Sequence, residues 1–395
     1  MLRLCLAGEY PVDVSKISGG VAYILCLLGE TLAERKDIDL HIVTPAKGRR
    51  GTRVERKPGA TIHYVGVPRR RMVPNMLRQV PALVSVFREL RPDVVNSHHC
   101  VTTNAAIRAG CTVVHTIHGV IHNELPYAKG LRKLSMRLHA ALERKAISRS
   151  DAVLSVAQYG LDQYKQWVKS PGYVVPGPVE DLFFRIPPTS HCEGILYVGI
   201  IHRRKNLMAL VRAMVDVRRK HHGAVLNVCG PVAQADYMSE IQLFVRRNGL
   251  EQNVNFVGLA DRQSIPRYLA DSVCLSLPSR QETAPVVISQ AMAGGRAVVA
   301  SPVGGVPEMV EDGVTGYLVE PDDIRTMAER ISALMDNKDL VKDMGKAGRD
   351  KALESYERHA HVDQLLSICR NVLADTEKTQ CAHDTSVVGG RIDEP

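Results

Sequence analysis

The chain has 395 residues, of which 45% are hydrophobic and 24% are charged, and its formal net charge is +9 at neutral pH. A chain of this length exceeds the size at which one hydrophobic core stops growing, so two domains are expected. The composition is that of an ordinary folded protein, and no apolar run is long enough to span a bilayer, which argues against a transmembrane protein. The opening MLRLCLAGEY is too short for a signal peptide and is expected to form a first strand.

The nine cysteines are scattered singly, without a CxxC pair. This usage favours reduced thiols in a cytoplasmic protein over a disulfide framework or a zinc site. Much of the positive charge lies in the first third of the chain, within residues 47–91. A basic excess attracts phosphate, nucleic acid or an anionic membrane, and by itself it does not say which.

Short β-branched runs alternate with helical patterns along the chain, which is typical of parallel βαβ units. In the first half, strands are expected at residues 2–8, 39–44, 61–67, 93–99, 112–119, 151–157 and 172–177, with helices near 20–35, 75–91, 101–109, 130–148 and 158–168. The second half repeats the plan, with strands expected at 194–199, 224–230, 254–258, 272–279, 297–301 and 316–320. The sequence therefore predicts an α/β protein with two doubly wound parallel sheets in tandem.

The boundary between the halves is expected in PGPVEDLFFRIPPTSHCEG, where prolines cluster and the periodicity is lost. This gives a first domain over 1–180, a second over 190–355, a helix over 356–374 that returns to the first domain, and a disordered tail over 375–395. Two open sheets joined in this way should face each other across a cleft at the carboxyl ends of their strands, where such sheets bind ligands.

Three motifs fall at these expected strand ends. Gly19 and Gly20 follow the first strand and open a helix, although the spacing is not that of a dinucleotide fingerprint. His118 ends the fifth strand, where a histidine can hydrogen-bond a sugar hydroxyl or move a proton. Arg203, Arg204 and Lys205 follow the first strand of the second half, on a loop that can neutralise a diphosphate. Each also has a plain structural interpretation, as a tight turn, a core histidine or a solvated basic turn.

The most informative stretch is SRQETAPVVISQAMAGG at residues 279–295. It follows a strand, and Thr283 is expected to cap a helix that has Pro285 in its first turn and ends at Gly294. Helical spacing places Gln290 on the face of the helix entrance, with Glu282 just before it. The stretch therefore predicts a cradle for an anion that carries hydroxylated groups on both sides.

These motifs together resemble a known family, the retaining GT-B glycosyltransferases that use nucleotide-sugar donors, of the glycosyltransferase family 4 type. The likeness covers nearly the whole chain up to the tail. Its most specific part is ETAPVVISQAMAGGRAVVASPVGGVPEMVEDGVTGYLVEPDD at residues 282–323. The motifs SGGV, HG at 118–119 and VGIIHRRKNL occur in the expected order and spacing.

The resemblance implies roles for individual residues. Arg204 and Lys205 match the basic residues that hold the donor diphosphate, and Glu282 matches a glutamate that lies against the donor sugar. His118 matches a histidine near the reacting sugar carbon, and Gly19 with Gly20 matches a turn that faces the acceptor and phosphate. The loop that contacts sugar and phosphate corresponds to Thr283, Ala284, Pro285 and Val286.

The family's proposed mechanism implies transfer with retention, in which the acceptor attacks on the face that the nucleotide leaves and a diphosphate oxygen takes its proton. No DxD-like motif lies near the cleft motifs, so neither a metal nor another cofactor is expected. The implied partners are a UDP- or GDP-linked sugar and a cell-surface glycan or lipid-linked acceptor, with no nucleic acid.

Two positions depart from the family pattern. Ile200 stands where many members have an arginine, and Gln290 stands where the family has a second glutamate that grips the ribose. An amide makes a weaker hydrogen bond than a carboxylate, so reduced or altered donor affinity is expected. Gln290 also leaves open a second hypothesis, a catalytically weak GT-B protein that binds nucleotide or glycan and partners an active transferase. A nucleotide-sugar epimerase would suit the fold but not these motifs.

The basic segment 47–91 leaves two interpretations open for a cytoplasmic protein. Its arginines and apolar stripe could lie on an anionic surface at the inner face of a membrane, where a lipid-linked acceptor is presented. Alternatively, the apolar stripe packs on the first sheet and the arginines are merely solvated.

Overall fold

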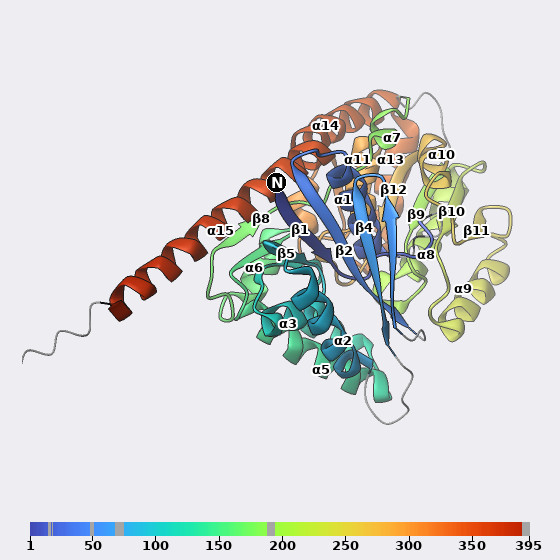
Figure 1. Ribbon diagram of the computed structural model, residues 1–395. Helices are drawn as coiled ribbons and strands as arrows, with labels where there is room; N and C mark the ends of the chain where they lie inside the picture. The colour runs from blue at the N-terminus through green and yellow to red at the C-terminus, as the bar shows by residue number, and fades with distance from the viewer. Residues whose placement is uncertain (15–16, 18, 48–50, 68–74, 188–193, 389–395) are drawn as a thin grey trace, which may run out of the picture.

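The structure, a computed structural model, describes residues 1–14, 17, 19–47, 51–67, 75–187 and 194–388. The described chain forms two α/β units, each built on its own sheet, and the two units lie side by side (Figure 1). The fold class expected from the sequence is therefore confirmed. The expected boundary falls partly on residues 188–193, which lie outside the described residues.

The first unit has an eight-stranded sheet with the order β3-β4-β2-β1-β5-β6-β7-β8. Its strands are β1 (Leu2–Ala7), β2 (Ile38–Lys47), β3 (Thr52–Lys57), β4 (Ala60–Val67), β5 (Val94–Ser97), β6 (Thr112–Ile117), β7 (Ala152–Ser155) and β8 (Gly172–Val174). Its helices are α1 (Gly20–Ala33), α2 (Asn75–Leu90), α3 (Cys100–Ala109), α4 (Ile121–Glu124), the 3₁₀ turn η1 (Leu125–Tyr127), α5 (Gly130–Ile147) and α6 (Gln158–Tyr164). The short helix α7 (Asp181–Phe184) lies in the segment that joins the two units.

Alternate residues of β1 supply two separate hydrophobic cores. Leu4 and Leu6 pack into a cluster with α1, whereas Cys5 and Ala7 pack into a cluster with α2 and α3. Successive side chains of a strand point to opposite faces, so a sheet covered by helices on both faces needs apolar residues at every position. This explains the continuous apolar run that opens the chain.

Strand β3 was not expected, because its residues TRVERK are almost all exposed and show no apolar face. It pairs antiparallel with β4, so the sheet is not wholly parallel. The two strands are joined by a tight turn in which Gly59 adopts a φ of 73°, which glycine tolerates best. Backbone pairing at a sheet edge creates this strand, and the side-chain pattern carries no signal for it.

The apolar stripe of α2 is used inside the protein. Leu83 and Phe87 are fully buried in the core that α2 forms with the sheet. For this helix, the second interpretation of segment 47–91 therefore holds: its apolar stripe packs on the first sheet. The arginines at positions 49, 50 and 69–71 lie outside the described residues. No helix in the described part of the chain combines the length and apolar character needed to cross a bilayer.

The second unit has a six-stranded, wholly parallel sheet with the order β11-β10-β9-β12-β13-β14. Its strands are β9 (Gly194–Val198), β10 (Val225–Cys229), β11 (Val254–Gly258), β12 (Ser272–Leu277), β13 (Ala297–Ala300) and β14 (Gly316–Leu318). Its helices are the 3₁₀ turn η2 (Arg203–Lys205), α8 (Leu207–Lys220), α9 (Ala235–Arg247), α10 (Ser264–Ala270), α11 (Val286–Ala293), α12 (Val306–Met309), α13 (Ile324–Asp336) and α14 (Lys338–Tyr356).

The last helix, α15 (Arg358–Val388), crosses back to the first unit and then projects beyond both units (Figure 1). It contacts α1, β5 and β6, and His361 hydrogen-bonds the carbonyl of Pro176 at 2.7 Å. The sequence analysis expected disorder from residue 375, whereas the helix continues to Val388, and that expectation is corrected for residues 375–388. The sequence of this part of the helix has no apolar stripe. Such a stripe is needed for packing against a sheet, but a helix can form without it. Residues 389–395 lie outside the described part.

A buried acid in α5 should make the stability of the first unit depend on pH. Burial raises the pKa of Glu143 from 4.5 to about 7, and its carboxyl is hydrogen-bonded by the Tyr164 hydroxyl. Because the folded pKa exceeds the unfolded one, this group lowers the free energy of unfolding as pH rises from 4.5 to about 7. Glu143→Gln should therefore be nearly neutral at pH 5 and stabilising at pH 8 by on the order of 3 kcal/mol. Urea unfolding of both proteins at the two pH values measures this, and a pH-independent difference would contradict it.

Candidate active site

A cavity of about 360 Å³ lies between the two units and takes side chains from both. In each sheet the cavity lies at the end of the strand from which the chain continues to one side of the sheet and later to the other. In the first unit β1 has β2 and β5 as neighbours, and in the second β9 has β10 and β12. The loops that follow β1, β9 and β12 all reach the cavity, which is the position expected for ligands of open α/β sheets.

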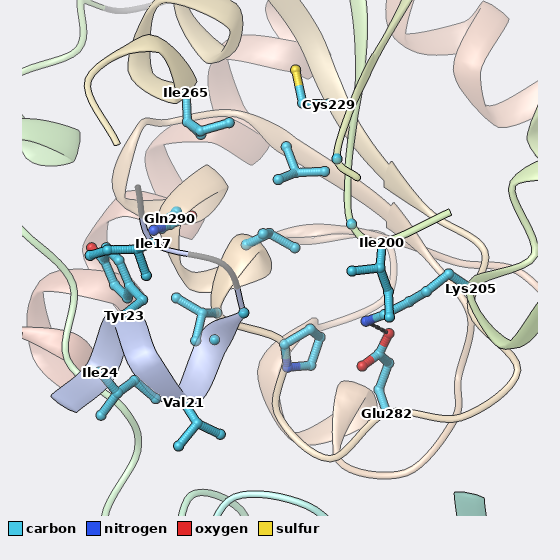
Figure 2. A pocket seen from close by; sticks show the side chains of 18 of the residues that line it. Ile17, Val21, Tyr23, Ile24, Ile200, Lys205, Cys229, Ile265, Glu282 and Gln290 are labelled. Atoms are coloured by element: carbon cyan, nitrogen blue, oxygen red, sulfur yellow. Dashed lines mark hydrogen bonds and ion pairs between the residues drawn. The ribbon is translucent and has the colours of Figure 1, made fainter. Parts of the chain in front are cut away.

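The loops after β9 and β12 bring together a buried ion pair at the cavity wall. Lys205 Nζ lies 2.5 Å from Glu282 Oε1 (Figure 2). Arg204 Nη1 lies 3.9 Å from the other carboxylate oxygen. Glu282 is only 6% exposed. Lys205 and Glu282 are 77 positions apart in the chain. The sequence analysis predicted Arg204, Lys205 and Glu282 as site residues but did not predict the contacts between them.

The charge state of Glu282 follows from a competition. Burial by itself would raise the pKa of its carboxyl, but the positive charges of Lys205 and Arg204 outweigh burial and hold the pKa below its usual value. Glu282 is therefore an anion throughout the physiological range. It can accept hydrogen bonds from hydroxyl groups in the cavity but is not a proton donor there.

Arg204 also connects the two units. Its guanidinium donates to the carbonyl of Gln281 at 2.9 Å and lies 3.7 Å from the carboxylate of Glu124 in the first unit. Glu124 also lines the cavity, and the sequence analysis missed it because α4 is a single short turn. Arg203, one residue earlier, turns away and pairs with Glu240 and Asp236 on the surface. Of the three basic residues of this loop, two therefore line the cavity.

Two helices begin at the cavity without a side-chain cap. α1 starts at Gly20 after Gly19, and α11 starts at Val286 after Pro285. Gly19 has a φ of 99°, and a Cβ at Gly20 would lie 3.4 Å from the Val286 side chain, so the two starts approach each other closely. Uncapped backbone N–H groups at helix starts favour an anion.

The expected cap of α11 is wrong. Pro285 occupies the N-cap position and no side chain caps the helix, so Thr283 is not the cap and Pro285 is not a helical residue. The loop of Thr283, Ala284, Pro285 and Val286 instead lines the cavity, as expected. Gly304 holds this loop in place: it adopts a φ of 60°, and a Cβ there would lie 1.7 Å from the Glu282 carbonyl oxygen.

His118 lines the opposite wall and belongs to a hydrogen-bonded chain. Its Nε2 lies 2.6 Å from His98 Nδ1, and His98 Nε2 lies 2.6 Å from Asn96 Oδ1. The Asn96 amide nitrogen donates to Val114 and Thr116, so its oxygen accepts from His98. His98 Nδ1 must then accept from His118 Nε2–H, which leaves His118 Nδ1 as an acceptor.

Burial lowers the pKa of His118 to about 4, with a further contribution from His361, so its ring is neutral near pH 7. A neutral ring with a fixed tautomer suits a hydrogen-bond acceptor for a substrate hydroxyl. The sequence predicted His118 but not its partners. Asn96 and His98 do lie at the carboxyl end of β5, beside β6, and that position is the signal that could have found them.

Gln290 lies across the cavity from the ion pair, beside Tyr23 of α1 (Figure 2). Its side chain is buried, with 7% exposure, and it interacts with the buried Tyr23 hydroxyl. Between these polar groups the wall is apolar, with Ile17, Ile200 and Ile265 pointing inward (Figure 2). The cavity therefore has one end with Lys205, Arg204 and Glu282, apolar sides, and a second polar end where Arg262 lies 5.8 Å from the centre of the Tyr23 ring.

Arg262 closes the cavity on the outer side and was also missed by the sequence analysis. Its two terminal nitrogens donate to the Glu30 carboxylate of α1 at 2.8 and 2.7 Å, and it contacts the buried Glu180 in the segment that joins the units. This ion cluster of Arg262, Glu30 and Glu180 links the second unit to the first. Its members are 82 to 232 positions apart in the chain, so no local sequence pattern predicts the cluster.

Among the described residues, one group of potential metal ligands comes together, His99, Cys100 and His139, and none of the three lines the cavity. The charged groups that do line it are the ion pair, Arg204, Glu124, Arg262 and Asp261. With the two helix starts, they provide positive charge for an anion and acceptors for hydroxyl groups. Two facing doubly wound domains with such a cleft define the GT-B class of α/β proteins.

Comparisons with known proteins agree with this class. The family profile "Glycosyltransferase Family 4" matches residues 18–181, and "Glycosyl transferases group 1" matches residues 180–351. The N-acetyl-alpha-D-glucosaminyl L-malate synthase of Bacillus anthracis is 25% identical over 90% of this chain and 95% of its own length. The glycogen synthase of Mycobacterium tuberculosis is 25% identical over 68% of this chain, which spans 66% of that relative.

Solved structures share the fold. Sucrose-phosphate synthase from Thermosynechococcus elongatus superposes with a TM-score of 0.79 at 21% identity, over 95% of this chain and 100% of that one. Anabaena HepE in complex with UDP-glucose gives a TM-score of 0.71 at 18% identity, over 96% and 100%. The chain belongs to the GT-B glycosyltransferases of the glycosyltransferase family 4 type.

Proposed function

We propose that this protein transfers a sugar from a UDP- or GDP-linked donor to a hydroxyl group of a glycan or lipid-linked acceptor, with retention of configuration and without a metal. The observation that carries the proposal is the placement of Lys205, Arg204 and Glu282 against the start of α11, with His118 on the facing wall. A nucleotide-sugar needs this combination, because its diphosphate is anionic and its two sugars present hydroxyl groups.

The donor fits the cavity in one direction. The diphosphate would lie at Lys205, Arg204 and the two uncapped helix starts, with the donor sugar against Glu282 and the ribose toward Gln290. The structure of HepE with UDP-glucose supports this class of donor for a protein of the same fold. The neutral Nδ1 of His118 would accept a hydrogen bond from a hydroxyl of the transferred sugar.

Retention is proposed here as the stereochemical outcome of the transfer. The acceptor oxygen forms a bond to the sugar carbon on the face from which the diphosphate departs, and a diphosphate oxygen accepts the acceptor proton. Glu282 is an anion paired with Lys205, and in this scheme it orients hydroxyl groups while the acceptor oxygen is the nucleophile. Lys205 and Arg204 stabilise the negative charge that develops on the leaving diphosphate, which is the role a metal ion would otherwise fill.

A catalytically weak partner protein is the second candidate, and only Gln290 favours it. A thermal-shift screen of UDP, GDP and ADP sugars, followed by hydrolysis assays on those that bind, separates the two. We expect nucleotide-sugars of one base to stabilise the protein against thermal unfolding and to be hydrolysed by it slowly. Stabilisation without turnover would favour the partner protein, and no stabilisation by any nucleotide would refute sugar transfer.

Gln290→Glu tests the proposed ribose contact. A carboxylate accepts stronger hydrogen bonds from hydroxyls than an amide, so the donor dissociation constant should fall by about tenfold. Isothermal titration with the nucleoside diphosphate found in the screen measures this. An unchanged dissociation constant would show that Gln290 does not contact the ribose.

A membrane contact through segment 47–91 is proposed only in a restricted form for a cytoplasmic protein. Because the apolar face of α2 is buried, such a contact would rest on basic side chains alone. It should then vanish at high salt, which vesicle sedimentation can measure.

A further inference from the structure

A second, smaller pocket adjoins the active-site cavity. It has a volume of about 100 Å³ and shares Glu124, Ile200 and Arg204 with the cavity as a common wall. Its remaining lining comes from Tyr127, Ala128, Arg132, Met136 and His202. The volume has room for a few water molecules, and hence for one phosphate or carboxylate group.

His202 presents an unused donor at this pocket. Its Nδ1 accepts the backbone N–H of Arg204 at 3.1 Å, so in the neutral ring the proton must reside on Nε2. His202 is only 4% exposed, and its Nε2 has no hydrogen-bond partner among the described residues. Burial, followed by the charge of Arg132, lowers the pKa of His202, so the neutral ring is the relevant form. A buried N–H without an acceptor is costly and points to an acceptor supplied by a ligand.

Arg132 supplies a positive charge at the same place. It lies on α5, close enough to His202 for its charge to lower the pKa of that ring. Its guanidinium makes no hydrogen bond or ion pair with another described residue. On the wall shared with the cavity, Arg204 lies 3.7 Å from Glu124 and offsets its negative charge, so Arg132 is the charge left for a ligand of the side pocket. The pocket therefore combines a net positive charge with donors and has no uncompensated acceptor.

We infer that this side pocket, lined by Arg132 and His202, binds an anionic oxygen group, a phosphate or a carboxylate, carried by the acceptor of the transferase. The inference rests on the proposed function, because only a sugar-transfer site needs an acceptor beside the donor. In the proposed function, Lys205, Arg204 and the helix starts already serve the donor diphosphate within the main cavity. The side pocket adjoins the cavity across the shared wall of Glu124, Ile200 and Arg204, and its other lining residues do not line the cavity.

Titration of inorganic phosphate into the full-length protein, with and without a saturating nucleoside diphosphate, tests this. Arg132→Ala should raise the phosphate dissociation constant by about tenfold, since a charged hydrogen bond is lost. Lys133→Ala removes the same charge from the next residue of α5, is exposed and does not line the pocket, so it should change the constant less than twofold. His202→Asn keeps an acceptor for the Arg204 N–H but removes the Nε2 donor, and it should weaken phosphate binding severalfold.

The results separate the two proposals. Equal weakening by Arg132→Ala and Lys133→Ala, or no phosphate binding by the wild type, would overturn the pocket. If the protein binds no nucleotide but its phosphate binding still depends on Arg132, the proposed sugar transfer is overturned. The anion site would then still stand. Malonate in place of phosphate, and vesicles of phosphatidylcholine with and without phosphatidic acid, assign the group to a carboxylate, a soluble phosphate or a lipid headgroup.

Discussion

Replacing Lys205 with alanine is expected to lower the rate of sugar transfer or donor hydrolysis by about a thousandfold, because it removes a preorganised positive charge from the leaving diphosphate. The same change leaves the buried Glu282 carboxylate with Arg204 as its nearest cation, 3.9 Å away. A buried charge that loses its partner costs several kcal/mol, so the free energy of unfolding should fall as well. Initial rates at saturating donor, with urea unfolding of the same samples, measure both effects.

Arg203→Ala is the matched control, since the neighbouring residue carries the same charge but pairs with Glu240 outside the cavity. It should leave the rate within about threefold of the wild type, as expected for an exposed ion pair. Lys205→Met, which keeps the apolar stem, separates loss of charge from loss of packing. A Lys205→Ala protein that is folded and retains more than a tenth of the wild-type rate would contradict the role given to this residue.

Arg262→Ala is expected to lower the free energy of unfolding by about 3 kcal/mol, since it leaves the buried carboxylate of Glu180 without its cation. It also removes the bidentate contact with Glu30, which ties the second unit to α1. We therefore expect the donor KM to rise as well, because the two walls of the cavity are no longer held together. Urea unfolding and steady-state kinetics measure the two quantities.

Arg267→Ala, an exposed arginine five residues later, should change neither quantity measurably. Adding Glu180→Gln to Arg262→Ala should recover part of the lost stability, because the unpaired buried charge is then removed. If the double variant is no more stable than Arg262→Ala alone, the loss comes from packing and the electrostatic account of this cluster is wrong.

The α/β alternation and the places of the main site residues could be predicted because they depend on local patterns. Strands buried on both faces require continuous apolar runs, and such runs mark β1, from Leu4 to Ala7, and β13. In a parallel sheet the residues that follow the strands gather at one edge, so Glu282 and Lys205 could be assigned to a site from position alone. The edge strand β3 and the end of α15 were missed because neither shows a periodic apolar pattern in the sequence.

The sequence by itself determined two doubly wound sheets and the kinds of side chain at their carboxyl edges, because periodicity and composition act over a few residues. Only the tertiary structure decided which of two adjacent arginines lines the cavity, and that Glu282 is kept ionised by Lys205. It also decided that Asn96 fixes the tautomer of His118 and that Arg262 joins the two units. These outcomes depend on burial and on distances between residues far apart in the chain, which are set only when the two sheets face each other.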